Sequence, residues 1–230
     1  MANPVTEGYR GARALRRQLR LDGRQRVDPF ELARQLEIVV VRRPLAERRI
    51  AGVYLHRPGN GRSFVLVNSS DVLVRQRFTV AHELGHWRFD RESVVVDDDF
   101  EGGSTAEERR ANAFAAELLL PEAAIGSWKP LRPWGESADD IASLAVTYGL
   151  SYDATLWRLR NCGIAMDDDQ LRTRRGEIAS EYRTQLATRG EEATILPPEF
   201  ISLTDAALER HLISHKRYEE LRGQASAMRF

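Results

Sequence analysis

A short motif in the middle of the chain, His82-Glu83-Leu84-Gly85-His86, constrains the fold more than any other feature. On a helix, residues four apart lie one above the other on the same face, so both imidazoles can reach a single ion. Zinc binds histidine nitrogen, and catalytic zinc sites use three protein ligands plus a water molecule. Glu83, next to the first histidine, can reach that water and remove its proton. The motif therefore predicts a helix with His82 and His86 as zinc ligands and Glu83 as general base.

A second histidine pair, His211 and His215, has the same spacing but a different context. Leu212 follows the first of these histidines, so no carboxylate stands where a catalytic base is needed. We therefore interpret this pair as surface or packing histidines. The single cysteine, Cys162, excludes an internal disulfide and a thiolate zinc cluster. The third ligand is therefore expected to be a carboxylate.

The next predicted helix offers three carboxylates as candidates for this third ligand: Glu107, Glu108 and Glu117. A capping box that starts at Ser104 would engage Glu107 and leave Glu108 free, whereas one that starts at Thr105 would engage Glu108. Helical periodicity does not decide between the two either. Asn112 lies one turn beyond Glu108 and could orient a ligand by a hydrogen bond, which favours Glu108.

The elements around the motif indicate an α+β fold with one small sheet. Asp28-Pro29 has the composition of an N-cap and a first helical residue. The run 57–62 is a strong hairpin signal, and the acidic segment 97–103 is expected to be a loop. We expect four helices, over residues 11–21, 28–36, 72–89 and 105–120. We expect three strands, over residues 38–41, 52–56 and 63–68.

The remainder of the chain is expected to be helical. A helix from Ala138, a turn at Gly149 and a second helix with Ser151 as its N-cap have helix-turn-helix spacing. The polar segment 164–230 is divided by Pro197-Pro198. Such a helix pair allows a second hypothesis, a DNA-binding regulator with a structural or vestigial metal site. Against it, the second helix offers few base-reading side chains, and Asp153 would face phosphates.

The charges balance, with 34 Lys and Arg against 34 Asp and Glu. This balance excludes a polycation that coats nucleic acid and an acidic solvating protein. It combines a basic segment, 1–50, with an acidic one, 90–108. The Arg-rich N-terminus and the acidic loop 90–103 could each dock a partner, which gives a third hypothesis, a toxin-like partner-binding protein. The chain shows no signal peptide, and no apolar run approaches the roughly 18 residues of a membrane span. We expect a cytoplasmic protein without membrane contact.

Several runs of residues resemble the ImmA/IrrE family of zinc metallopeptidases, which are gluzincin-like. These runs are Val67-Asn68, Arg75 to His86, Glu108-x-x-Ala111-Asn112 and Glu117 to Pro121. The resemblance implies a zincin-like catalytic domain in which Glu108 joins His82 and His86 around Zn²⁺ and Glu83 is the base. With the rest of the chain it gives three expected parts: a metallopeptidase domain over 1–127, a helix-turn-helix-like module over 128–165 and a helical extension over 166–230.

The resemblance also implies a class of substrate. Members typically cut, or trigger the loss of, a repressor that binds DNA through a helix-turn-helix, so the expected substrate is a repressor or antitoxin-type protein. Zinc peptidases of this layout hold the substrate along an edge strand, for which 63–68 is our candidate. The group that stabilises the oxyanion stays open among five residues: His56, Tyr54, Arg77, Tyr148 and Tyr152.

Overall fold

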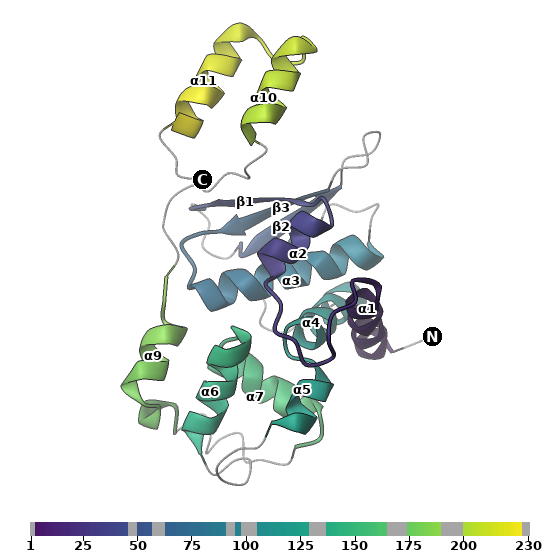
Figure 1. Cartoon of the computed structure of the whole chain (residues 1–230), viewed down its shortest axis with the longest axis vertical. Coiled ribbons are helices and arrows are strands. Elements are labelled where there is room, and N and C mark those ends of the chain that lie inside the picture. Colours follow the sequence, from purple (N-terminus) through teal and green to yellow (C-terminus); the bar gives the residue numbers. More distant parts are fainter. Residues whose placement is uncertain are drawn as a thin grey trace.

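One mixed sheet and the helices packed against it form the body of the molecule (Figure 1). The structure is a computed structural model that describes residues 3–45, 50–56, 63–90, 95–97, 105–128, 137–164, 174–189 and 200–226. Its strands are β1 (Val39–Arg43), β2 (Gly52–His56), β3 (Ser63–Asn68) and β4 (Val95–Asp97), in the order β1-β3-β2-β4. This arrangement confirms the predicted α+β class.

The helices of the described residues fall into three groups along the chain. Those up to residue 127 are α1 (Pro4–Gln18), α2 (Pro29–Gln35), α3 (Leu73–Phe89), α4 (Ala106–Leu119) and α5 (Glu122–Ser127). Next come α6 (Ala138–Tyr148) and α7 (Tyr152–Asn161). The last are the 3-10 helix η1 (Arg174–Glu177), α9 (Ser180–Leu186), α10 (Phe200–Glu209) and α11 (His215–Ser226). No helix of the described segments is long and apolar enough to cross a membrane.

The first helix starts at Pro4, earlier than predicted, because a cap lies upstream of the hydrophobic pattern. The Asn3 side chain accepts a hydrogen bond from the Val5 amide at 2.9 Å, and Pro4 takes the first helical position. The second helix begins as predicted, since Asp28 Oδ1 accepts from the Phe30 amide at 3.0 Å.

Strand β3 lies inside the sheet, which contradicts our expectation that 63–68 is an edge strand. It pairs in parallel with β1 and antiparallel with β2, so both of its backbone edges are used. The antiparallel register agrees with the hairpin prediction, although the turn itself, 57–62, lies outside the described residues. The edges of the described sheet are therefore β1 and β4.

Strand β4 was not anticipated from the sequence. The acidic segment was expected to be a loop, but Asp97 is the last residue of a short strand that pairs antiparallel with β2. Val96 lies opposite Val53 in this pairing. Two consecutive valines, Val95 and Val96, supply the β-branched side chains that a strand favours, despite the acidic residues that follow. The rest of the acidic segment, 98–104, lies outside the described residues.

A single hydrophobic cluster connects the sheet to the helices on both sides of α4. Tyr54, Val65 and Val67 from the sheet join it together with Leu84 of α3 and Phe114 of α4. The cluster continues without interruption into α6 and α7 through four further residues: Ile141, Leu144, Leu156 and Leu159. Figure 1 shows these two helices on the side of α3 and α4 that faces away from the sheet.

Helices α6 and α7 lie at the residues where the sequence predicts them. Gly149 ends the first in a left-handed conformation, φ 70°, and Ser151 Oγ caps the second by accepting from the Ala154 amide at 3.1 Å. A DNA-binding role for this helix pair stays the alternative hypothesis of the sequence analysis. Further along, α10 and α11 pack on each other, and the Tyr218 hydroxyl donates to Asp205 Oδ1 at 3.0 Å.

Candidate metal centre

Helix α3 carries the histidine motif, and its first turn is held differently from what the sequence suggests. The polar run 69–71, whose residue types often cap helices, precedes it, but Val72 is the N-cap and makes no side-chain hydrogen bond. Gln76 Nε2 instead donates to the carbonyls of Ser69, at 3.1 Å, and Asp71, at 2.8 Å. These bonds fix the loop that connects β3 to the helix.

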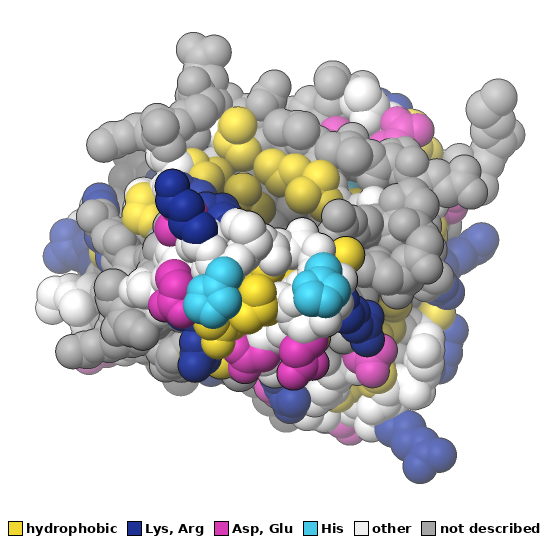
Figure 2. Space-filling view, turned by 90° about the horizontal axis from the view of Figure 1, so that it is seen from above, with side chains coloured by type: hydrophobic (Ala, Val, Ile, Leu, Met, Phe, Trp, Pro, Cys, Tyr) yellow, Lys and Arg dark blue, Asp and Glu magenta, His cyan; other side chains and the backbone are white. Residues whose placement is uncertain are grey.

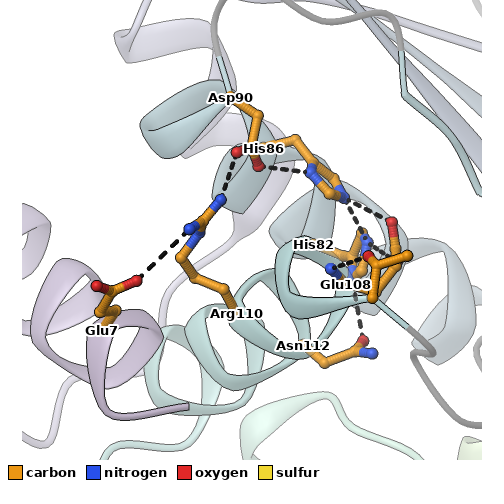
Figure 3. Close-up of polar contacts among 8 residues, drawn as sticks. Glu7, His82, His86, Asp90, Glu108, Arg110 and Asn112 are labelled. Atoms are coloured by element: carbon orange, nitrogen blue, oxygen red, sulfur yellow. Dashed lines mark hydrogen bonds and ion pairs between the residues drawn. The ribbon is translucent and has the colours of Figure 1, made fainter. Parts of the chain in front are cut away.

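The two histidines of the motif point at each other and at one carboxylate of the next helix (Figure 3). His82 and His86 are fully buried, and their Nε2 atoms lie 2.9 Å apart. Glu108 Oε2 lies 3.2 Å from Nε2 of His82, and Glu108 Oε1 lies 3.3 Å from Nε2 of His86. The ligand atoms of this His-His-Glu cluster all lie within 4.8 Å of one another, so the three residues could hold a metal ion.

The hydrogen bonds on the far side of each ring show which atoms face the centre of the cluster. His82 Nδ1 lies 2.9 Å from Asn112 Oδ1, and His86 Nδ1 lies 2.9 Å from Asp90 Oδ2. Both oxygens are acceptors, so each Nδ1 carries a proton. In the neutral form of each ring Nε2 then has a lone pair that can bind a cation, whereas in the protonated form Nε2 can donate to Glu108. Two lone pairs and a carboxylate therefore converge in a buried space, which is a donor set that fits a cation such as zinc.

The pKa values of the cluster follow from the same contacts. Burial lowers the pKa of His86, but its hydrogen bonds with Glu108 and Asp90 outweigh burial and raise it above its usual value. Burial likewise raises the pKa of Glu108, but the hydrogen bonds with the two histidines outweigh burial and hold it well below its usual range. Glu108 therefore stays ionised at neutral pH, and its negative charge favours a cation in the cluster.

Glu83 is fully buried beside the first residue of β2. A Cβ atom added to Gly52 would lie 2.8 Å from Glu83 Oε1 and 2.4 Å from Thr79 Cγ2. Both distances are shorter than real Cβ contacts, so the space for the glutamate depends on the absence of a side chain at residue 52.

The contacts of their side chains distinguish the three candidate carboxylates on α4. Thr105 is the N-cap, and its Oγ1 accepts from the backbone amide of Glu108 at 3.2 Å. The Glu108 side chain turns to the histidines, whereas Glu107 is exposed. Glu117 lies about two and a half turns beyond Glu108, where it pairs with Arg13 at 2.8 Å and with Arg158. Ser104, the alternative cap, lies outside the described residues.

Sequence reasoning missed Asp90 and Arg110. Asp90 is the C-cap of α3 and holds His86 through the bond described above, while Arg110 Nη2 lies 2.5 Å from Asp90 Oδ1. Asp90 follows His86 by four residues, a spacing that places both side chains on one helix face and could have signalled the contact.

Two of the five candidates for oxyanion stabilisation are engaged elsewhere. Arg77 donates to the Val27 carbonyl at 2.7 Å, and the Tyr148 hydroxyl donates to the Arg24 carbonyl at 3.0 Å, so both hold the segment between α1 and α2. Of the other three, Tyr54 and Tyr152 are buried, whereas His56 is half-buried with its Nδ1 3.2 Å from Ser63 Oγ.

The second histidine pair lies at the surface, which confirms its interpretation. His211 is exposed, and the His215 side chain is 76% exposed and 3.8 Å from Glu219. Figure 2 looks down on the α10–α11 end of the molecule and shows histidine side chains (cyan) on that surface.

Comparison with known proteins finds a family whose model matches the chain. The model of a peptidase family, described as the IrrE N-terminal-like domain, matches residues 33–160, which is more than half of the 230 residues. The matched segment contains the histidine motif, Glu108 and Asn112. No curated protein matches the chain.

Proposed function

Because the chain belongs to the IrrE N-terminal-like peptidase family, we propose that it is a zinc-dependent endopeptidase. The observation that carries the proposal is the convergence of three groups: His82 Nε2 and His86 Nε2, which belong to fully buried residues, and the half-buried Glu108 carboxylate. Two imidazoles and one carboxylate form a ligand set typical of catalytic zinc in peptidases.

In this proposal each residue of the cluster has a defined task. His82, His86 and Glu108 hold the ion, and Asn112 fixes the ring of His82 through its Nδ1. A zinc ion held there supplies Lewis acidity toward water and the peptide carbonyl. Glu83 accepts a proton from the attacking water on its carboxylate and returns it to the nitrogen of the leaving amine.

The proposed substrate is a protein, of the repressor or antitoxin type that the family resemblance implies. It would bind in an extended conformation along an edge strand. Among the strands of the described sheet, β4 is the edge next to β2, and β2 begins at Gly52 beside Glu83. This neighbourhood favours β4 over β1 as the strand that pairs with substrate, in place of the 63–68 segment.

The contacts of α7 support a packing role for the helix pair rather than DNA recognition. Leu156 and Leu159 belong to the common hydrophobic cluster, and the Arg158 guanidinium is buried against the Leu120 carbonyl at 3.0 Å. Asp153, in the first turn of α7, forms an ion pair with Arg175 at 2.8 Å, and its negative charge would oppose a DNA phosphate.

The test of the proposed mechanism is the Glu83→Gln variant. Wild-type protein and the variant are each co-expressed with the protein that the neighbouring gene encodes. Fragments of that neighbouring protein are then identified by mass spectrometry. Because only the base is removed, we expect the variant to keep one zinc ion and to cleave about 100-fold more slowly or worse. Cleavage at the wild-type rate would show that Glu83 is not the base.

The ligand assignment is tested by metal analysis of purified variants. His82→Ala and Glu108→Gln should lose zinc, since each removes one ligand. The matched controls His211→Ala and Glu107→Gln make the same changes at exposed positions and should keep it. Full zinc occupancy in His82→Ala or Glu108→Gln would overturn the assignment.

A further inference from the structure

A chain of charged side chains extends from the back of His86 to the first helix (Figure 3). Asp90 Oδ2 accepts from His86 Nδ1, and Asp90 Oδ1 lies 2.5 Å from Arg110 Nη2. The other arm of the guanidinium, Nη1, lies 3.5 Å from Glu7 Oε2. Four residues from three helices therefore connect the metal cluster to α1.

Burial decreases steadily along this chain. The side chain of His86 is 0% exposed, that of Asp90 11%, that of Arg110 18% and that of Glu7 37%. The Arg110 guanidinium also lies over the ring of Phe89 at 5.0 Å, which holds its plane between the two carboxylates. The bonds at the inner end of the chain, between His86, Asp90 and Arg110, are thus protected from water. Hydrogen bonds between charged groups are stronger in such a buried environment than in water.

The two histidines are supported in chemically different ways. His82 donates to a neutral amide, Asn112, whereas His86 donates to a carboxylate. A carboxylate fixes the ring orientation and the tautomer, and it makes the opposite nitrogen a stronger ligand. Asp90 can do so only while one oxygen faces His86, and the bond from Arg110 to its other oxygen holds it in that orientation.

We infer that Asp90, Arg110 and Glu7 are positioning residues that orient His86 for metal binding. This inference rests on the proposed role of His86 as a metal ligand. Asp90 acts directly on the ring, Arg110 acts through Asp90, and Glu7 acts through Arg110. Helix α1 (Pro4–Gln18) precedes the segment 33–160 that the family model matches, yet in this arrangement it contributes to metal affinity without supplying a ligand.

The test measures the zinc affinity of the full chain by competition with a chromogenic chelator, so no substrate is needed. Asp90→Ala should weaken zinc binding by about 10- to 100-fold, the usual cost of losing such a partner. Asp90→Asn keeps an acceptor oxygen and should fall between the wild type and Asp90→Ala. Arg110→Met should weaken binding less than Asp90→Ala, and Glu7→Gln less again.

A double variant separates action through Asp90 from a general effect. If Arg110 works through Asp90, Arg110→Met should change zinc affinity little when Asp90→Ala is already present. Equal losses in both backgrounds would overturn the proposed order of action. Cobalt absorption spectra of the folded variants give a second readout, because a reoriented His86 changes the ligand field.

Arg13→Met is the matched control for Arg110→Met. Arg13 on α1 pairs with Glu117 on α4 at 2.8 Å, so its loss weakens the contact between the same two helices without touching His86. We expect Arg13→Met to leave zinc affinity unchanged, and an equal loss in both variants would show that helix packing alone is responsible. If the wild type binds no zinc, the proposed function fails; if it binds zinc and Asp90→Ala binds it equally tightly, the positioning role alone fails.

Discussion

The position of Glu83 depends on one small residue of the sheet. Its carboxylate is fully buried between α3 and the start of β2, where Gly52 leaves the space that it occupies. A base must lie within hydrogen-bonding distance of the proton that it removes, so a small displacement has a large effect on the rate. Gly52 is thus expected to matter for catalysis although it has no functional group.

Gly52→Ala should reduce cleavage by about 100-fold while zinc stays bound, because the new methyl group displaces Glu83 and not the ligands. Overpacking at this site should also lower the free energy of unfolding by about 1–3 kcal/mol. Cleavage assays, metal analysis and urea titrations measure the three quantities. Gly126→Ala is the control, since a Cβ at residue 126 meets no atom within 4 Å. Unchanged cleavage in Gly52→Ala would contradict the proposed dependence.

The structure brings the predicted site residues together where the geometry is local. The spacing of His82 and His86 places both imidazoles on one helix face, whatever the rest of the fold does. Asn112 and the family resemblance already favoured Glu108 over Glu107, whereas the capping argument would have been misleading: Thr105 caps α4, yet the Glu108 side chain contacts the two histidines. Asp90 was missed because an acidic residue at a helix end is common at surfaces, and its contact with Arg110 joins residues far apart in sequence.

Among the helices, the close packing of α3 on α4 sets the distance between the histidines and Glu108. A Cβ added to Gly85 would lie 2.9 Å from Ala111 Cα and 3.2 Å from Ala111 Cβ. Gly85 lies between His82 and His86 on α3, and Ala111 lies one turn after Glu108 on α4. The two helix backbones therefore come close together beside the His-His-Glu cluster.

Gly85→Ala should push α4 away from α3 and move the Glu108 carboxylate out of reach of both Nε2 atoms. We expect a loss of zinc affinity of at least about 10-fold, as for a misplaced ligand, and a lower melting temperature of the metal-free protein. Gly223→Ala makes the same change in a helix with no atom within 4 Å of the new Cβ, so it should not reduce either quantity. Wild-type zinc affinity in Gly85→Ala would show that the helix spacing is not critical.

Prediction of the elements succeeded where strong local signals mark both ends. The strands over 52–56 and 63–68 have the expected bounds, and α2 starts at its predicted cap. Helix α5 was missed because it is a short helix that begins directly after Pro121, which the sequence suggested only as the end of α4. The edge position of 63–68 was wrong because strand order depends on long-range pairing, which hydrophobic alternation along one segment does not determine.

At the scale of the whole molecule, a buried ion pair joins α7 to α4 and α1. Arg158 Nη2 pairs with Glu117 Oε2, and both side chains are almost completely buried. The same guanidinium donates to the Leu120 carbonyl at 3.0 Å and lies 4.7 Å from the ring of Tyr9 on α1. Since the hydrophobic cluster is also continuous across these helices, we expect the segments up to residue 161 to unfold together.

Arg158→Met should lower the free energy of unfolding by about 3–5 kcal/mol, because it leaves the Glu117 carboxylate buried without its inner partner. Arg13, which is partly exposed, still reaches Glu117 at 2.8 Å and should not replace the lost cation. In Arg158→Met/Glu117→Leu, which removes both charges, we expect recovery of part of the loss. Urea titrations followed by tryptophan fluorescence and by circular dichroism should give one coincident transition in each variant. Two separate transitions in the wild type would show instead that α6 and α7 form an independently stable unit.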